Sequence, residues 1–230
     1  MVVIGIPLKY NHLPDGRCIL YLGEKIRRTI QKAGGFVLPI VQVQDYDYVD
    51  TKYNEFSELT EDEKTSIEKY LDMCDGVIFP GGHKITPFDV YLLKRCIERD
   101  IPTLGICLGM QLMSCVGEDF KVYENDTDIN HFQESDDLLT HKIQLNKDSY
   151  LYKILEKDEI LVNSFHNYHV NINNNYKISA YSEDGYIEGI ELKDKTFHIG
   201  VQWHPEISYD FDDNSKKIID FFINICNKEG

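Results

Sequence analysis

Short runs of apolar residues alternate with amphipathic stretches along the first half of the chain. The apolar runs predict strands over residues 2–6, 36–41, 75–79 and 101–106. Apolar positions three and four apart predict helices over residues 23–33, 59–73, 87–99 and 108–116. Thr60 followed by Glu63 is a helix-start signature for the second of these helices. Such alternation is typical of a parallel sheet, because parallel neighbours are joined by crossovers.

The second half of the chain has a different pattern, with short strands joined by short turns. These strands are expected at residues 141–145, 160–162, 177–181, 187–191 and 197–201, before a closing helix at 216–226. Residues 44–59 are polar and rich in tyrosine, which predicts a long surface connection; a partner surface is the alternative interpretation. We expect one α/β domain over residues 1–230, a three-layer sandwich with a mostly parallel central sheet and an antiparallel β-rich second half.

Composition narrows the kinds of partner that this chain can have. Its 230 residues carry 24 Lys and Arg against 39 Asp and Glu, a net charge of −15 that would repel a nucleic-acid backbone. No apolar run approaches the roughly 20 residues that span a bilayer, and the amino terminus lacks the basic region of a signal peptide. The six cysteines form no CxxC pair. We therefore expect a cytoplasmic protein with reduced thiols, no nucleic-acid partner and no membrane association.

Cys107 lies in the stretch Gly105-Ile106-Cys107-Leu108-Gly109, between a predicted strand and a predicted helix. In that context the pattern G-x-C-x-G is typical of a nucleophile elbow, where glycines permit a tight and strained turn. The start of a helix favours a thiolate, and the N–H of Leu108 can stabilise a developing oxyanion. A buried structural cysteine in a packing turn is the other interpretation of these five residues.

Three further polar features follow predicted strands. His204 and Glu206 are two residues apart, and in an extended chain Glu206 can hold one imidazole nitrogen while the other faces a nucleophile. The fold must bring His204 to Cys107, because 97 residues separate them. Gly81 and Gly82 can supply a second oxyanion donor or form an ordinary turn. The stretch Val-Asn-Ser-Phe-His at 162–166 is a polar cluster that breaks an apolar strand or forms a surface corner.

These pieces occur in one order: Pro-Gly-Gly at 80–82, Gly-Ile-Cys-Leu-Gly-Met-Gln at 105–111, Asn-Ser-Phe-His at 163–166 and Gly-Val-Gln-Trp-His-Pro-Glu at 200–206. In this combination the chain resembles the class-I glutamine amidotransferase-like superfamily. Within that superfamily it resembles the γ-glutamyl-γ-aminobutyrate hydrolase group, also called peptidase C26. Segments at 33–39, 130–133 and 141–143 extend the resemblance over nearly the whole chain. It implies a flavodoxin-like sandwich of the class-I amidotransferase type.

The resemblance also implies a mechanism. Cys107, His204 and Glu206 would form a catalytic triad that cleaves a γ-glutamyl amide through a γ-glutamyl thioester, with no cofactor and no metal. The backbone N–H groups of Leu108 and Gly82 would bind the oxyanion. The residues that the resemblance places against a small-molecule γ-glutamyl substrate are Gln111, Ser164, Phe165 and His166.

Two alternatives stay open for the whole protein, and a homodimer is compatible with either. The chain is a free-standing γ-glutamyl amide hydrolase, or it is a glutaminase subunit that delivers ammonia to a separately encoded synthetase. Leu108 stands where the hydrolase group usually has arginine, and leucine is closer to the glutaminase domains of biosynthetic amidotransferases. The segment from Gly82 to Asp100 is short and is expected to offer the leaving amine few charged contacts. A binding protein that lost turnover is a third reading, against which the intact triad argues.

Four histidines in the second half invite a metal site, namely His131, His141, His166 and His169. Their spacing matches no helical HxxxH pattern, so we interpret them as polar histidines of the surface or of a pocket. Asp210, Asp212 and Asp213 lack the glycine and the distal glutamate of a calcium loop, and are expected to precede and cap the last helix.

Overall fold

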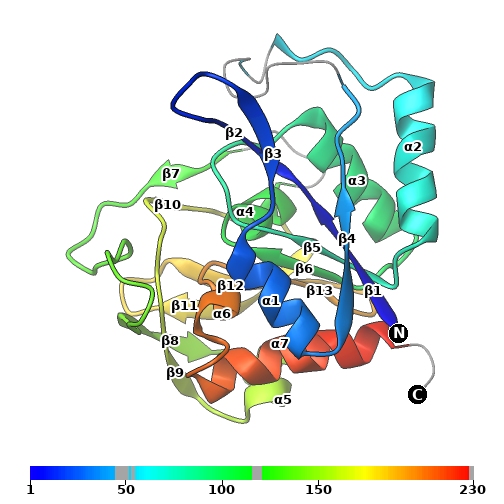
Figure 1. Ribbon diagram of the computed structural model, residues 1–230. Helices are drawn as coiled ribbons and strands as arrows, with labels where there is room; N and C mark the ends of the chain where they lie inside the picture. Colours follow the sequence, from blue (N-terminus) through cyan, green and yellow to red (C-terminus); the bar gives the residue numbers. More distant parts are fainter. Residues whose placement is uncertain (45–51, 53–54, 116–120, 228–230) are drawn as a thin grey trace.

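The computed structural model describes residues 1–44, 52, 55–115 and 121–227. Nine strands form one mixed sheet in the order β4-β1-β5-β6-β13-β12-β11-β8-β9 (Figure 1). Five neighbouring strands are parallel: β4 (Gly35–Ile40), β1 (Val2–Pro7), β5 (Gly76–Phe79), β6 (Thr103–Ile106) and β13 (His198–Val201). The other four continue the sheet in antiparallel fashion: β12 (Ile187–Leu192), β11 (Tyr176–Ser182), β8 (His141–Leu145) and β9 (Glu159–Val162). The predicted α/β class, with a parallel and an antiparallel half, is confirmed.

Helices cover both faces of this sheet, which gives the three predicted layers. One face carries α1 (Glu24–Lys32), α5 (Tyr150–Leu155) and α7 (Asp213–Cys226). The other face carries α2 (Glu61–Asp72), α3 (Pro87–Glu98) and α4 (Leu108–Ser114). Figure 1 shows α1 and α7 side by side, and the two helices are in contact. Each layer is held by apolar side chains buried against the sheet, such as Ile30 and Phe222 on the first face and Leu71 and Phe88 on the second.

Several short elements were not expected from the apolar pattern, because two to six residues are too few to show a period. A hairpin joins β2 (Lys9–His12) to β3 (Cys18–Tyr21), and β7 (Tyr123–Glu124) pairs with β10 (Tyr168–His169). Helix α5 and the short helix α6 (Pro205–Ser208) were also not expected. The hairpin matters for the site below, because it carries Lys9 next to the loop that follows β5.

Two helix starts follow their predicted signatures. The side chains of Thr60 and Glu63 form a reciprocal capping box at the start of α2. Asp212 caps α7, where its side chain accepts hydrogen bonds from the N–H groups of Asn214 and Ser215. Helix α7 therefore begins at Asp213, three residues before the predicted start at 216.

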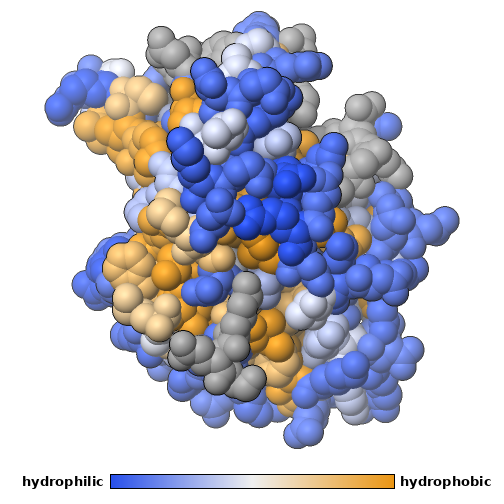
Figure 2. Space-filling view, turned by 90° about the vertical axis from the view of Figure 1, so that its right-hand side faces the viewer, coloured by the Kyte–Doolittle hydropathy of each residue, from blue (hydrophilic) through white to orange (hydrophobic). Residues whose placement is uncertain are grey.

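The face of the molecule that carries α2 and both chain ends is mostly hydrophilic, with smaller hydrophobic areas between the polar side chains (Figure 2). Among the helices of the described residues, none combines the length and apolar character that a membrane crossing requires. Most of the tyrosine-rich stretch 44–59 falls outside the described residues, so its role as a surface connection stays a prediction.

Candidate active site

Cys107 lies between the end of β6 and the start of α4, in the sharp turn that the G-x-C-x-G pattern predicts. Its backbone has φ 52° and ψ −107°, a positive φ that residues with a side chain rarely adopt. The flanking glycines make this turn possible. A Cβ on Gly109 would lie 2.1 Å from the carbonyl oxygen of Phe79, and one on Gly105 would lie 2.6 Å from the sulfur of Met113. The thiol is therefore held at the helix start by close packing of α4 against the sheet.

The sheet brings His204 to Cys107 because β6 and β13 are parallel neighbours. Ile106 pairs with Val201, and the N–H of Cys107 donates to the carbonyl of Val201 at 2.8 Å. Gly81, after β5, completes the group. A Cβ on Gly81 would lie 2.7 Å from Cε1 of His204 and 3.6 Å from Cβ of Cys107. The carboxyl ends of three parallel strands thus converge on one point, which is the usual place for a site in such a sheet.

Glu206 holds the imidazole of His204, with 2.7 Å between Oε1 and Nδ1. The expectation that an extended chain aligns these two residues is wrong. Strand β13 ends at Val201, and Pro205 opens the short helix α6, whose first turn contains Glu206. Proline favours the first position of a helix because its φ is already helical and it has no N–H to leave unpaired. The pairing is therefore made by a tight corner.

Electrostatics at His204 favour its protonated form. Burial by itself lowers the pKa of His204, but the Glu206 carboxylate and the Cys107 sulfur outweigh burial and raise that pKa well above its ordinary value. A hydrogen bond to each of these two partners adds to the effect. A histidine in this form carries a proton that it can pass to a leaving group.

Asn163 holds the backbone of His204 through its side-chain amide, and it was not among the residues predicted for the site. Its Nδ2 donates to the backbone carbonyl of His204 at 2.8 Å, and its Oδ1 accepts from the backbone N–H of His204 at 2.8 Å. Asn163 is fully buried. The ring of Phe165 packs edge-on against the imidazole of His204, with 5.5 Å between ring centroids. The signal in the sequence was the polar stretch 162–166, which interrupts an apolar strand.

The other predicted substrate residues have protein partners. Nε2 of Gln111 lies 3.3 Å from both the carbonyl oxygen of Tyr168 and Oε1 of Gln202. Ser164 donates its hydroxyl to the carbonyl of His131 at 2.8 Å. His166 is buried, and its Nδ1 lies 3.0 Å from the carbonyl oxygen of Tyr168. Of the predicted substrate residues, Phe165 is the one whose side chain contacts His204 in the described structure.

A cavity of about 290 Å³ adjoins this group on the side of the β2–β3 hairpin. Lys9, His83 and Lys84 are among its lining residues. A Cβ on Gly82 would lie 3.4 Å from both Lys9 Cδ and Leu108 Cδ2, so Gly82 links the cavity to the elbow. That the Gly82–Asp100 segment offers the leaving amine few charged contacts stays a prediction, although His83 and Lys84 of this segment line the cavity. The basic groups come partly from the hairpin, whose pairing with this loop is not visible in the sequence.

Three of the four histidines considered for a metal gather elsewhere in the molecule. His131, His141 and His166 surround the carboxylate of Glu188 in the antiparallel half, and all four residues are buried. The interpretation of these three as polar histidines of a surface or a pocket is wrong, since they lie in the interior. His169 lies outside the group and stacks on Tyr186, with 4.0 Å between ring centroids.

Comparison with known proteins agrees with this geometry. A family model described as Peptidase C26 matches residues 87–206. Protein NtpR of Enterococcus hirae is 30% identical over 183 residues, covering 67% of this chain and 76% of NtpR. RP404 of Rickettsia prowazekii, named as a glutamine amidotransferase-like protein, is 31% identical over 206 residues, covering 61% of this chain and 73% of RP404. The CTP synthase of Thermosipho africanus is 26% identical over 187 residues, but this chain spans only 35% of that protein.

Solved structures share the fold across nearly the whole chain. The glutaminase domain of Trypanosoma brucei CTPS, with bound acivicin, aligns with a TM-score of 0.61 and 18% identity, covering 98% of this chain and 92% of that one. A glutamine amidotransferase of Thermotoga maritima aligns with a TM-score of 0.57 and 16% identity, covering 98% and 96%. The matched family residues 87–206 contain Cys107, His204 and Glu206. This chain belongs to the peptidase C26 family, within the class-I glutamine amidotransferase-like superfamily.

Proposed function

We propose that the protein is a cysteine-nucleophile hydrolase that cleaves a γ-glutamyl amide, releasing glutamate and an amine. The observation that carries this proposal is the strained turn at Cys107, placed against an imidazole whose far nitrogen is held by Glu206 at 2.7 Å. Nucleophile, proton carrier and orienting acid are the three parts that covalent acyl transfer requires. Membership of the peptidase C26 family supports the same reaction.

In the first half of the reaction, the Cys107 thiolate attacks the γ-carbonyl carbon of the substrate. The carbonyl oxygen gains negative charge, and the N–H of Leu108 is suited to bind it, because the first N–H groups of a helix have no acceptor within the helix. Gly82 is the proposed second donor, next to Gly81 on the loop that contacts His204. When the C–N bond breaks, the imidazolium of His204 gives its proton to the leaving amine.

In the second half, water resolves the γ-glutamyl thioester. His204, now neutral, takes a proton from the water as its oxygen adds to the thioester carbon. The C–S bond then breaks, glutamate leaves, and the thiolate–imidazolium pair is restored. Glu206 stays ionised throughout and stabilises the imidazolium, as the acid does in other triads.

The basic cavity beside Gly82 suggests the kind of amine that leaves. Lys9 and Lys84 line this cavity, and Nζ of Lys9 also lies 3.4 Å from the buried carboxylate of Asp89. A leaving amine that carries its own carboxylate would find complementary charge there, whereas ammonia or a simple alkylamine would not. We therefore favour an amino-acid amine such as γ-aminobutyrate over ammonia.

The runner-up is a glutaminase subunit that delivers ammonia to a separately encoded synthetase. It is favoured by the similarity to CTP synthase, of which this chain spans only a part, and by the fold shared with a CTPS glutaminase domain. In that case glutamine would be the substrate, and the isolated chain would turn over slowly.

A matched substrate pair tests both proposals. Glutamate release is measured with γ-glutamyl-γ-aminobutyrate, with the γ-glutamyl amide of butylamine, which lacks only the distal carboxylate, and with glutamine. We expect γ-glutamyl-γ-aminobutyrate to release glutamate fastest of the three. Lys84→Gln should reduce the ratio of its rate to the rate of the butylamide. Lys94→Gln, an exposed lysine on α3, is the control. Glutamate release from none of the three would overturn the hydrolase, and glutamine hydrolysis that begins only when a synthetase is added would establish the runner-up.

A further inference from the structure

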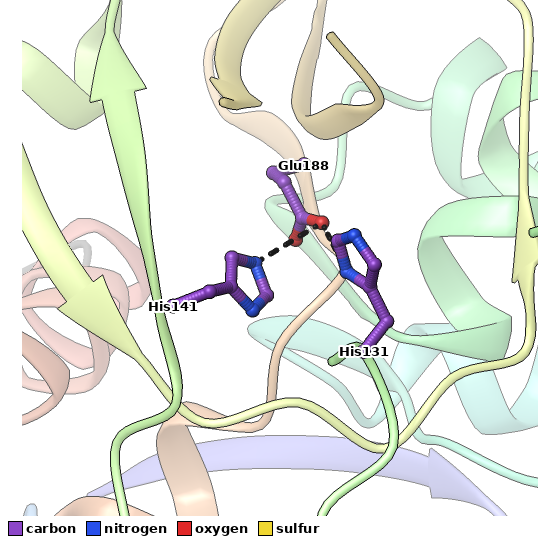
Figure 3. Close-up of side chains that lie close together, drawn as sticks. All are labelled: His131, His141 and Glu188. Carbon is purple, nitrogen blue, oxygen red and sulfur yellow. Dashed lines mark ion pairs between the residues drawn. The ribbon is translucent and has the colours of Figure 1, made fainter. Parts of the chain in front are cut away.

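A buried carboxylate with three histidines around it lies in the antiparallel half of the sheet. Glu188, on β12, is completely inaccessible. Its Oε1 lies 3.4 Å from Nδ1 of His131, 3.5 Å from Nε2 of His141 and 3.4 Å from Nε2 of His166. Figure 3 shows the rings of His131 and His141 directed at this carboxylate from two separate segments of the chain. The four side chains form what we call the Glu188 cluster.

The polar atoms of this cluster lack proper partners. Among the described residues, neither oxygen of Glu188 and neither ring nitrogen of His141 makes a hydrogen bond. Burying such groups without hydrogen bonds costs about 1–3 kcal/mol each, and more for an ionised carboxylate. The contacts around Oε1 are 3.4–3.5 Å long, which is beyond an ordinary charge-assisted hydrogen bond of about 2.7–2.9 Å. A cation bound by Oε1 of Glu188 and Nε2 of His141 together would remove part of this cost.

We propose that the Glu188 cluster binds one divalent transition metal, with Zn²⁺ as the favoured ion. Its protein ligands would be His131 Nδ1, His141 Nε2 and Glu188 Oε1, since these three residues offer ligand atoms that all lie within 4.8 Å of one another. Bonds of about 2.0–2.1 Å at tetrahedral angles separate ligand atoms by about 3.3–3.4 Å. Oε1 of Glu188 lies 3.4 Å from His131 Nδ1 and 3.5 Å from His141 Nε2. Imidazole and carboxylate are ligands that zinc accepts.

The far nitrogen of His131 already has the kind of partner that metal ligands use. Nε2 of His131 lies 2.9 Å from Oδ2 of Asp184. An imidazole that donates outward in this way presents a bare lone pair inward. Nδ1 of His131 also shares a hydrogen bond of 3.2 Å with Nε2 of His166, and a metal on His131 Nδ1 would replace that bond.

The position of the cluster indicates a structural metal. All three protein ligands are buried, so the ion would be out of reach of a substrate. The ion would join β8, β12 and the segment at residues 131–133. That segment pairs with residues 163–166 through a hydrogen bond from the N–H of His166 to the carbonyl of His131. Asn163 and Phe165, which contact His204, belong to this second segment. A bound metal would thus stiffen the support of His204.

The wild-type protein provides the first test. The chain, purified without a metal-affinity step, is analysed for metal, stripped with a chelator and titrated with Zn²⁺ alone or Co²⁺ alone. We expect about one zinc per chain, a melting temperature that rises when zinc is restored, and visible d–d absorption from bound cobalt. Less than about a tenth of an equivalent after zinc loading, with the same melting temperature in zinc and in chelator, would overturn the proposal and leave protons as the cations that hold the cluster.

Variants then assign the ligands. His141→Gln removes a ligand and should abolish stoichiometric zinc binding, and Asp184→Asn should weaken zinc affinity about 10–100-fold by releasing the far nitrogen of His131. His169→Gln is the matched control, because His169 lies in the same region but outside the cluster. Full zinc retention in His141→Gln, or equal losses in His141→Gln and His169→Gln, would overturn the assignment. These readouts do not use activity, so their failure would leave the proposed hydrolysis untouched.

Discussion

Two buried groups of histidine and carboxylate lie on neighbouring strands of the same sheet, and they are built in opposite ways. His204 and Glu206 follow β13, whereas Glu188 lies on β12 with three histidines around it. The backbone N–H of Gln202 donates to the carbonyl of Glu188 at 2.8 Å, so the two groups share a direct connection. In the first group one carboxylate serves one imidazole. In the second, three imidazoles converge on one carboxylate.

The number of imidazoles around each carboxylate decides what each group can do. Glu206 occupies one nitrogen of His204, and the other side of that ring faces Cys107 and Gly81 at the open ends of the parallel strands. The ring keeps a nitrogen for proton transfer. In the Glu188 cluster the ring nitrogens point inward or are bonded to Asp184 and Tyr168, and nothing is left for a substrate. The first group is suited to chemistry and the second to stability, and the following changes should separate the two.

The largest effect is expected from removing the sulfur. Cys107→Ala should lower kcat by about 10⁶-fold, since the covalent route is lost and only binding and the oxyanion site remain. Glutamate release measures this loss, and urea unfolding should show little change in the free energy of unfolding. Cys18→Ala, at an exposed cysteine, is the control. Iodoacetamide should label Cys107 before Cys74, whose pKa burial raises to about 12. Activity that survives in Cys107→Ala would contradict the assignment of catalysis to the group at His204 and Glu206.

Within the triad, the two partners of Cys107 should differ. His204→Ala should lower kcat by about 10⁴–10⁶-fold, because it removes the proton carrier, and Glu206→Gln should cost about tenfold to a hundredfold less. The pH profile of kcat/KM supplies a second readout, since the loss of the carboxylate should lower the pKa of His204. Equal rates for Glu206→Gln and the wild-type protein would show that the acid only maintains the corner at Pro205.

The Glu188 cluster should respond in the opposite way. Glu188→Gln should lower the free energy of unfolding by about 3 kcal/mol, because it removes the negative charge at the centre of three imidazoles. The kcat of Glu188→Gln should fall far less than the kcat of the Cys107 and His204 variants. Urea unfolding at fixed zinc or chelator concentration measures the first effect. A Glu188→Gln protein of unchanged stability but no activity would place Glu188 in the chemistry instead.

Two neighbouring glycines test how tightly the group around His204 is packed. Gly81→Ala should lower kcat by about 10²-fold, because its Cβ would lie 2.7 Å from Cε1 of His204 and displace the ring. Gly82→Ala adds a Cβ whose nearest neighbours lie at 3.4 Å, an ordinary contact, and should cost clearly less. Initial rates of the two variants, with melting curves to verify folding, give the comparison. The reverse order would mean that the loop at 81–82 does not determine where His204 sits.

The last effect, which appears only at acidic pH, concerns His198, at the opposite end of β13 from His204. His198 is buried and has only Asp100 as an ion-pair partner among the described residues; burial lowers its pKa to about 4. Between pH 6.5 and pH 4 the unfolded chain therefore binds a proton that the folded chain does not, and stability falls as the pH falls. His198→Gln should remove about 3 kcal/mol of that pH dependence. Urea unfolding of both proteins across this range measures it, and parallel curves would contradict the prediction.

The sequence by itself determined the parts of this protein that depend on near neighbours. The alternation of strand and helix, the capping box at Thr60 and Glu63, and the elbow at Cys107 all arise from residues a few positions apart, whose sterics and hydrogen bonds are local. The pairing of His204 with Glu206 was also expected, although the corner at Pro205 and not an extended strand produces it.

Only the tertiary structure decided how distant segments meet. Asn163 reaches His204 across 41 positions, and His131 reaches His166 across 35. Strand order sets such contacts. Only when β13 lies between β6 and β12 can His204 contact Cys107 and can Glu188 lie beside the three histidines. The spacing of residues along the chain does not predict these contacts. A sheet brings residues together by the register of its paired strands and not by their separation in sequence.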